Sequence, residues 1–174
     1  SELPEIIPVF PLAGALLLPR GQMPLNIFEP RYLTMVDDAL RLTHRLIGMI
    51  QPDTAHGGSE TRPNLFRVGC VGRITQLAEA GDGRYILELT GIARFKVIEE
   101  LTVLTAYRQC KVDYFPFTDD FTARKCEEAV DREALLEVLN DFLKANNLKV
   151  DWEGIESAPN EAVIESSVIN TALI

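Results

Sequence analysis

Adjacent acidic pairs are the first residues in this chain whose type could support acid–base chemistry. Asp37-Asp38 and Glu127-Glu128 fall in segments with helical periodicity. Neighbouring residues on a helix point in different directions, so neither pair can hold two carboxylates over one substrate. We expect both pairs to lie on solvated helix faces.

Cysteine and histidine are scarce. The three cysteines are far apart and odd in number, with no CxxC motif, which argues against a disulfide framework or a zinc site and favours a reducing cytoplasm. Cys70 falls on the apolar side of a predicted strand and is expected in the core. His44 is expected to complement the dipole at a helix end. The residues are Cys70, Cys110, Cys126, His44 and His56.

Sequence motifs for common chemistries are missing. The chain has no G-x-x-x-x-G-K-[ST] phosphate loop and no G-x-S-x-G nucleophile elbow. GCVG at 69–72 matches the GxxG of an RNA-binding loop, but it lies in an alternating strand pattern. We therefore predict no catalytic residue, no metal and no cofactor.

The stretch PLNIFEPRYL at 24–33 allows two interpretations, an active-site loop or the junction of a strand and a helix. Apolar residues recur at helical spacing from Tyr32 onward. Pro30 suits the first helical position, and Glu29 would face the positive end of the helix dipole. The junction is the interpretation that we adopt.

Charge divides the chain into two parts. The 174 residues are 47% apolar and carry a formal net charge of -9, which disfavours grip on a phosphate backbone. Acids and bases balance up to residue 112, so residues 113–174 carry the excess of acid. The apolar run at 12–18 is too short to span a bilayer, and no basic signal-peptide start precedes it, so no membrane association is expected.

The first part of the chain reads as strands. Pro8 lies in the first of them and suggests an edge strand or a strand that begins there. Residues 51–64 are polar and rich in glycine and proline, and they predict a long loop. Gly-Asp-Gly at 81–83 predicts a hairpin turn, and Gly91 a bulge. The predicted strands are 6–10, 16–18, 24–28, 46–50, 66–74, 85–89, 93–98 and 107–115.

The second part reads as helices. One helix is expected from about residue 119 to Ala145, and a last one after Pro159. The prediction is an α+β chain: a small, partly closed β-barrel with one inserted helix over 1–117, followed by a helical lobe over 118–174.

Two long stretches then resemble a known family. Residues 7–40, IPVFPLAGALLLPRGQMPLNIFEPRYLTMVDDAL, are similar to the start of the amino-terminal domain of Lon proteases. Residues 65–100, LFRVGCVGRITQLAEAGDGRYILELTGIARFKVIEE, resemble the second signature of that domain. The resemblance implies a PUA-like barrel followed by helices, of the kind found in stand-alone bacterial members.

In full Lon this domain helps to recognise substrates and to assemble the hexamer, and the ATPase and protease domains follow it. The sequence has neither of these domains, so the resemblance implies no proteolytic activity. It implies a non-catalytic module that binds unfolded polypeptide or a partner protein, linked to proteolysis or protein quality control. It does not predict the oligomeric state.

Aromatic residues at two junctions are the candidate peptide-binding residues. Phe28, Arg31 and Tyr32 lie where a strand meets a helix, and Phe115 and Phe117 lie at the hinge between the two parts. An exposed sheet edge or an apolar pocket there could hold an extended segment. The alternative for each aromatic residue is a place in the core.

An RNA-binding module is the alternative function, by analogy with PUA domains. Arg67, Arg73, Arg84 and Arg94 could form a basic patch on the neutral first part. The acidity of the whole chain disfavours this hypothesis.

Overall fold

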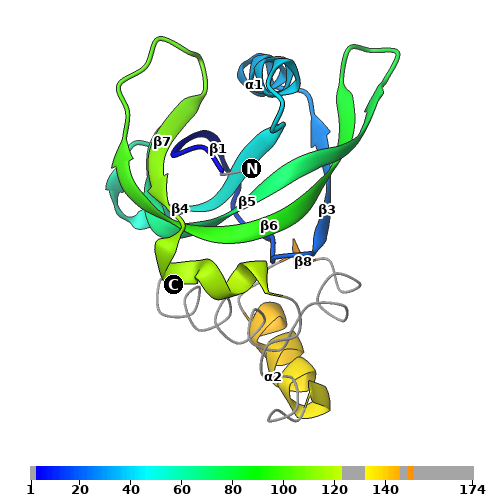
Figure 1. Cartoon of the computed structure of the whole chain (residues 1–174), viewed down its shortest axis with the longest axis vertical. Coiled ribbons are helices and arrows are strands. Elements are labelled where there is room, and N and C mark those ends of the chain that lie inside the picture. The colour runs from blue at the N-terminus through cyan, green and yellow to red at the C-terminus, as the bar shows by residue number, and fades with distance from the viewer. Residues whose placement is uncertain (1–2, 123–131, 146–148, 151–174) are drawn as a thin grey trace.

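A six-stranded sheet dominates the computed structural model, which describes residues 3–122, 132–145 and 149–150 (Figure 1). Strands take up most of its first part, and helices are few. The elements in chain order are β1 (Ile6–Pro11), β2 (Ala15–Leu16), β3 (Gln22–Ile27), α1 (Pro30–Arg41), β4 (Leu46–Gly58), β5 (Pro63–Glu79), β6 (Tyr85–Glu100), β7 (Arg108–Asp113), the 3₁₀ segment η1 (Phe115–Phe121), α2 (Arg132–Ala145) and β8 (Lys149–Val150).

The strand order is β3-β6-β5-β4-β1-β7, and β7 also pairs with β6. The pairings therefore run through β6, β5, β4, β1 and β7 and return to β6. Among the described strands, β3 pairs only with β6 and lies outside this circuit. β2 and β8 form a separate parallel pair.

Two expectations about the strands were wrong. β1 is not an edge strand, because it lies between β4 and β7; its pairing with β4 begins at Val9, after Pro8. Residues 51–64 are not a loop, because β4 and β5 continue through them as a hairpin with irregular register. Gly57 and Gly58 have positive φ near its tip. The polar composition reflects an arm whose residues are mostly exposed.

The turn and the bulge were predicted correctly. Residues 80–84 connect β5 to β6, and Gly83 has φ of 83° there. The register shifts where Val71 pairs with Ala93 but Gly72 pairs with Gly91. A Cβ added to Gly91 would lie 2.0 Å from the carbonyl oxygen of Leu18. The absence of a side chain at Gly91 therefore lets the backbone of β6 pass close to the backbone at Leu18.

Helix α1 begins at Pro30, as predicted, after the extended residue Glu29. Glu29 makes no side-chain capping bond; its carboxylate instead pairs with Arg31 at 2.9 Å. The helix ends at Arg41, which supplies the cation of the last turn. The prediction for His44 was wrong, because it lies beyond the end of the helix.

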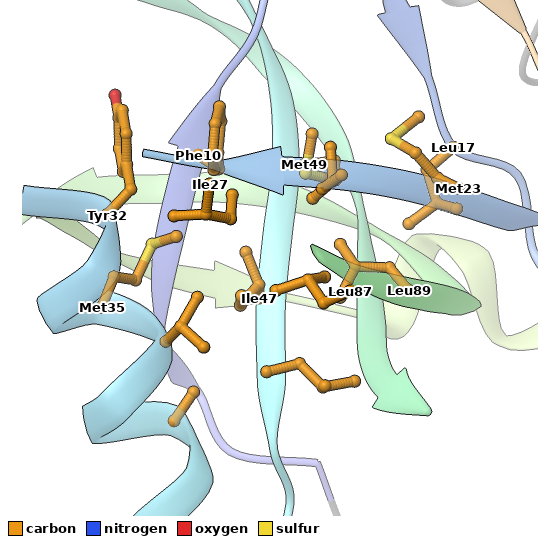
Figure 2. Packing of buried hydrophobic residues seen from close by; sticks show 14 of the residues in the cluster. Phe10, Leu17, Met23, Ile27, Tyr32, Met35, Ile47, Met49, Leu87 and Leu89 are labelled. Atoms are coloured by element: carbon orange, nitrogen blue, oxygen red, sulfur yellow. The ribbon is translucent and has the colours of Figure 1, made fainter. Parts of the chain in front are cut away.

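Apolar side chains form two buried clusters. One lies between α1 and strands that include β3 and β6, and Figure 2 shows Met35, Ile47 and Leu87 within it. The rings of Phe10 and Tyr32 stack in the same cluster, with centroids 4.2 Å apart. The second cluster draws on the five strands of the circuit and includes Phe95, which is fully buried.

Two hydrogen bonds hold α1 in place. The hydroxyl of Tyr85 donates to Asp37, and that of Tyr107 donates to Asp38, each at 2.7 Å. In Figure 1, α1 lies between the β5–β6 turn and the connection from β6 to β7. Tyr85 is the first residue of β6, directly after that turn, and Tyr107 lies at the end of that connection. Asp37 and Asp38 are partly exposed, so the expected solvated helix face is confirmed only in part: each carboxylate also accepts a hydrogen bond from a tyrosine.

Helices follow β7, but not with the predicted bounds. The chain forms η1 first, and α2 begins at Arg132. Glu127-Glu128, Cys126 and the helix predicted after Pro159 lie outside the described residues. Cys70 and Cys110 are buried free thiols, and burial raises the pKa of Cys110 to about 11.

Candidate functional site

The five candidate peptide-binding residues lie on two separate surfaces. Phe28, Arg31 and Tyr32 are at the start of α1, whereas Phe115 and Phe117 belong to η1. Figure 1 shows α1 at one end of the sheet and η1, in yellow-green, at the other. The structure therefore does not bring the two groups together in one site.

The surface at the start of α1 has one exposed aromatic residue. Phe28 is 64% exposed, whereas Tyr32 is buried and stacks on Phe10. The Arg31 guanidinium lies 4.7 Å from the Tyr32 ring centroid and also pairs with Glu29. Burial raises the pKa of Tyr32. Tyr32 is a core residue, and Arg31 covers it.

The residues of η1 separate into an outer and an inner set. Side chains three positions apart lie above one another in a 3₁₀ helix. Phe115, Thr118 and Phe121 are exposed, while Phe117 and Asp120 are buried. The exposed residues recur every three positions although the backbone kinks at Phe117. Phe115 is 80% exposed, which makes it the most exposed phenylalanine among the described residues.

The inner residues of η1 anchor it to β6. Asp120 accepts hydrogen bonds from the Arg94 side chain at 2.6 and 2.8 Å, and from the Arg94 backbone N–H at 2.9 Å. The Phe117 ring lies 4.7 Å from the Arg94 guanidinium carbon. Charge-assisted bonds in a dry setting fix the segment, so its outer aromatic residues are held in place.

A groove of about 440 Å³ lies beside these outer residues. We call it the η1 groove. It runs between the amino-terminal segment, the end of β7 and η1, and it is lined by Leu3, Glu5, Val112, Asp113, Tyr114, Phe115, Thr118 and Phe121.

Hydrogen bonds hold the walls of the η1 groove together. The Tyr114 hydroxyl donates to the Pro4 carbonyl at 2.9 Å, and the Val112 N–H donates to the Glu5 carbonyl at 2.8 Å. Asp113 accepts from the Phe115 N–H at 2.9 Å. Burial raises the pKa of Tyr114. The groove is thus formed before anything binds, which lowers the entropic cost of binding.

Sequence reasoning identified one residue of this groove, Phe115, and missed the other seven, among them Leu3, Glu5 and Phe121. Phe121 could have been found, because it lies six positions after Phe115, two turns of a 3₁₀ helix. No local signal in the sequence placed Leu3 or Glu5 beside residues more than a hundred positions later. The pairing of β1 with β7 brings them there.

The four arginines of the RNA-binding alternative do not form a patch. Arg94 is buried and bound to Asp120, so it cannot contact a phosphate; its inclusion was wrong. Arg84 pairs with Asp82 at 2.6 Å in the β5–β6 turn. Arg67 and Arg73 are exposed on β5.

A second groove, of about 470 Å³, lies along the β4–β5 hairpin. His56 contacts Asp53 there at 2.9 Å. The Glu100 carboxylate, also in the lining, accepts a hydrogen bond from the Arg108 guanidinium. This bond to a cation lowers the pKa of the Glu100 carboxyl. Within residues 3–122, 132–145 and 149–150, no cluster of three histidine, cysteine or acidic side chains could hold a metal ion.

The fold is that of a β-rich domain with few helices. Comparison with known families gives the particular kind: the chain belongs to the ATP-dependent protease La (LON) substrate-binding domain family, whose model matches residues 6–169.

Curated relatives are Lon proteases. The chain is 30% identical to Lon protease 2 of Myxococcus xanthus over 65% of its length, and 27% identical to the Lon protease of Anaeromyxobacter dehalogenans over 91%. It spans only 13% and 17% of the lengths of these two proteins. The similarity therefore concerns one region of each relative.

Solved structures with the same fold include two Lon amino-terminal domains. The Lon N-terminal domain protein from Xanthomonas campestris is 26% identical, with a TM-score of 0.55 over 78% of this chain and 73% of its own. The N-terminal domain of Mycobacterium avium complex Lon protease is 16% identical, with a TM-score of 0.53 over 97% and 81%, and it shows the fold alone.

Membrane insertion through a helix finds no support in the described part of the chain, where no helix is both long and apolar enough to cross a bilayer.

Proposed function

We propose that this chain is a non-catalytic module that binds non-native polypeptide, using the η1 groove as its principal contact surface. The observation that carries this proposal is Phe115, an 80% exposed aromatic side chain held on an anchored segment at the mouth of a preformed groove. Exposed aromatic anchors beside pockets are the usual centres of binding energy in protein recognition.

Membership of the substrate-binding domain family supports this proposal, because it concerns the same part of the chain. Phe28 at the start of α1 provides a second, smaller apolar contact. The free edge of β3 is a weaker candidate, because Pro24 in its centre has no N–H to donate to an added strand.

We further propose a PUA-like barrel built on the five-strand circuit, followed by a helical lobe. Its partner in the cell would be a polypeptide destined for proteolysis, and its setting a reducing cytoplasm, where buried thiols such as Cys70 stay free. The chemistry of degradation would belong to ATPase and protease domains of the Lon type and not to the residues of this domain.

Fluorescence anisotropy with a reduced, carboxymethylated protein as a permanently unfolded probe tests the proposal. Burying a phenylalanine side chain contributes about 1.5–3 kcal/mol, so Phe115→Ser should weaken binding by about tenfold or more. Leu104→Ser is the matched control, because Leu104 is fully exposed and lies outside both candidate surfaces.

Neither substitution touches the core, so melting curves of both variants should match the wild type. The absence of binding by the wild type, or equal weakening by Phe115→Ser and Leu104→Ser, would count against the proposal. Phe28→Ser in the same assay measures the contribution of the surface at the start of α1.

A further inference from the structure

We infer that the η1 groove selects polypeptide segments in which a large apolar side chain is flanked by lysine or arginine. This inference rests on the proposed function and adds the class of segment that the same site prefers.

The apolar part of this preference comes from the groove's lining. Val112 is buried in its wall, and Phe115 and Phe121 stand beside it with 80% and 51% of their surface exposed. An apolar side chain inserted among these residues would remove apolar surface of both partners from water. A segment without such a side chain would leave the aromatic side chains of the groove exposed to water.

The basic part comes from the charges of the lining. Glu5 and Asp113 are its two charged residues, and both are acidic. Asp113 already accepts the Phe115 N–H, but a carboxylate has further lone pairs for a cation. Glu5 is exposed. Two carboxylates beside an apolar wall attract a basic flank and repel an acidic one.

Two lysines lie close to the lining without being part of it: Lys96 is opposite Asp113 in the β6–β7 register, and Lys111 is opposite Ile6, next to Glu5, in the β1–β7 register. Both are exposed. Exposed charges are screened by solvent and salt, so the two lysines reduce the negative potential of the lining without cancelling it. Removing the Lys96 charge should therefore strengthen the preference for a basic flank, whereas removing the two carboxylates should weaken it.

A set of labelled peptides of equal length tests the inference. Each carries one phenylalanine in a Gly/Ser background, flanked by lysine, glutamine or glutamate. The wild type should bind the lysine peptide most tightly and the glutamate peptide least tightly. Each of the two carboxylates should account for about two- to fivefold of the difference, and added salt should reduce this difference.

The decisive variant is Glu5→Gln/Asp113→Asn, which removes both charges and keeps an acceptor oxygen for the Phe115 N–H. It should bind the three peptides with nearly equal affinity. Glu60→Gln/Glu79→Gln is the matched control: it changes the net charge equally at two exposed positions outside the groove. This control should keep the wild-type order of affinities for the three peptides. Lys96→Met should increase the difference in affinity between the lysine and glutamate peptides.

The outcomes separate the inference from the proposed function. If no peptide binds and the unfolded probe also fails to bind, the proposed function is wrong. If the peptides bind equally to the wild type, or the order persists in Glu5→Gln/Asp113→Asn, the preference inferred here is wrong while polypeptide binding stands. Self-association of the wild type in sedimentation, abolished by Phe115→Ser, would make the groove an interface between copies and overturn the inference.

Discussion

Arg94 in β6 and Asp120 near the end of η1 form a fully buried ion pair. Their side chains are 3% and 2% exposed, and Nη2 and Oδ1 lie 2.6 Å apart. The pair joins the sheet to the segment that carries Phe115. The geometry of the η1 groove therefore depends on an interaction that lies outside the groove.

Removing one partner of this pair should be costly. Asp120→Ala should lower the free energy of unfolding by about 3–5 kcal/mol, because it leaves the Arg94 charge buried without its partner. Urea denaturation measures the change. Replacing both partners, as in Arg94→Met/Asp120→Leu, should recover part of the loss: no uncompensated charge remains, but the backbone N–H of residue 94 loses its acceptor. A double variant as unstable as Asp120→Ala would contradict this account.

The bond between Tyr107 and Asp38 should make stability depend on alkaline pH. Burial, together with the hydrogen bond to Asp38, raises the pKa of Tyr107 to about 12 from an ordinary value of 10.0. A raised pKa means that the folded state favours the protonated phenol. The stabilisation is therefore complete below about pH 10 and is lost as the pH rises through about 12.

Tyr107→Phe should accordingly lower stability by about 1–2 kcal/mol at neutral pH, because it removes a hydrogen bond to a charged group. Between about pH 10 and 12 its denaturation midpoint should fall less steeply than that of the wild type. Chemical denaturation across this range compares the two proteins. Parallel curves would show that Tyr107 does not titrate with folding.

Gly91 should tolerate no side chain. A Cβ there would lie 2.0 Å from the Leu18 carbonyl oxygen, which is backbone and cannot give way locally. Gly91→Ala should destabilise the protein by about 3 kcal/mol or more, as expected for forced backbone movement. Gly81→Ala is the control, since a Cβ at Gly81 meets nothing within 4 Å. Equal melting temperatures for the two variants would contradict the described packing.

Local signals in the sequence predicted the elements that depend on local chemistry. Pro30 predicted the start of α1, Gly-Asp-Gly predicted the β5–β6 turn, and Gly91 predicted the bulge in β6. Each of these depends on the conformational limits of one or two residues. The hairpin at 51–64 was missed because an exposed arm needs no apolar alternation, and its glycines and prolines resemble those of a loop.

The candidate site was predictable only in part. Phe115 was identified from its place at the hinge, but Arg94 was expected in a basic surface patch with Arg67, Arg73 and Arg84. Its burial depends on Asp120, which lies 26 positions later and supplies the counter-ion. Long-range pairing of this kind leaves no local pattern in one sequence. The same is true of Glu5, which reaches Asp113 only through the pairing of β1 with β7.

The most direct test of polypeptide binding at the η1 groove is amide chemical-shift mapping by NMR during titration with the permanently unfolded probe. We expect the largest changes at residues 3–6 and 111–122, with little change around Leu104. The same titration of Phe115→Ser should leave these signals nearly unmoved. Changes confined to the exposed face of Arg67 and Arg73, or no change at any residue, would contradict the central claim.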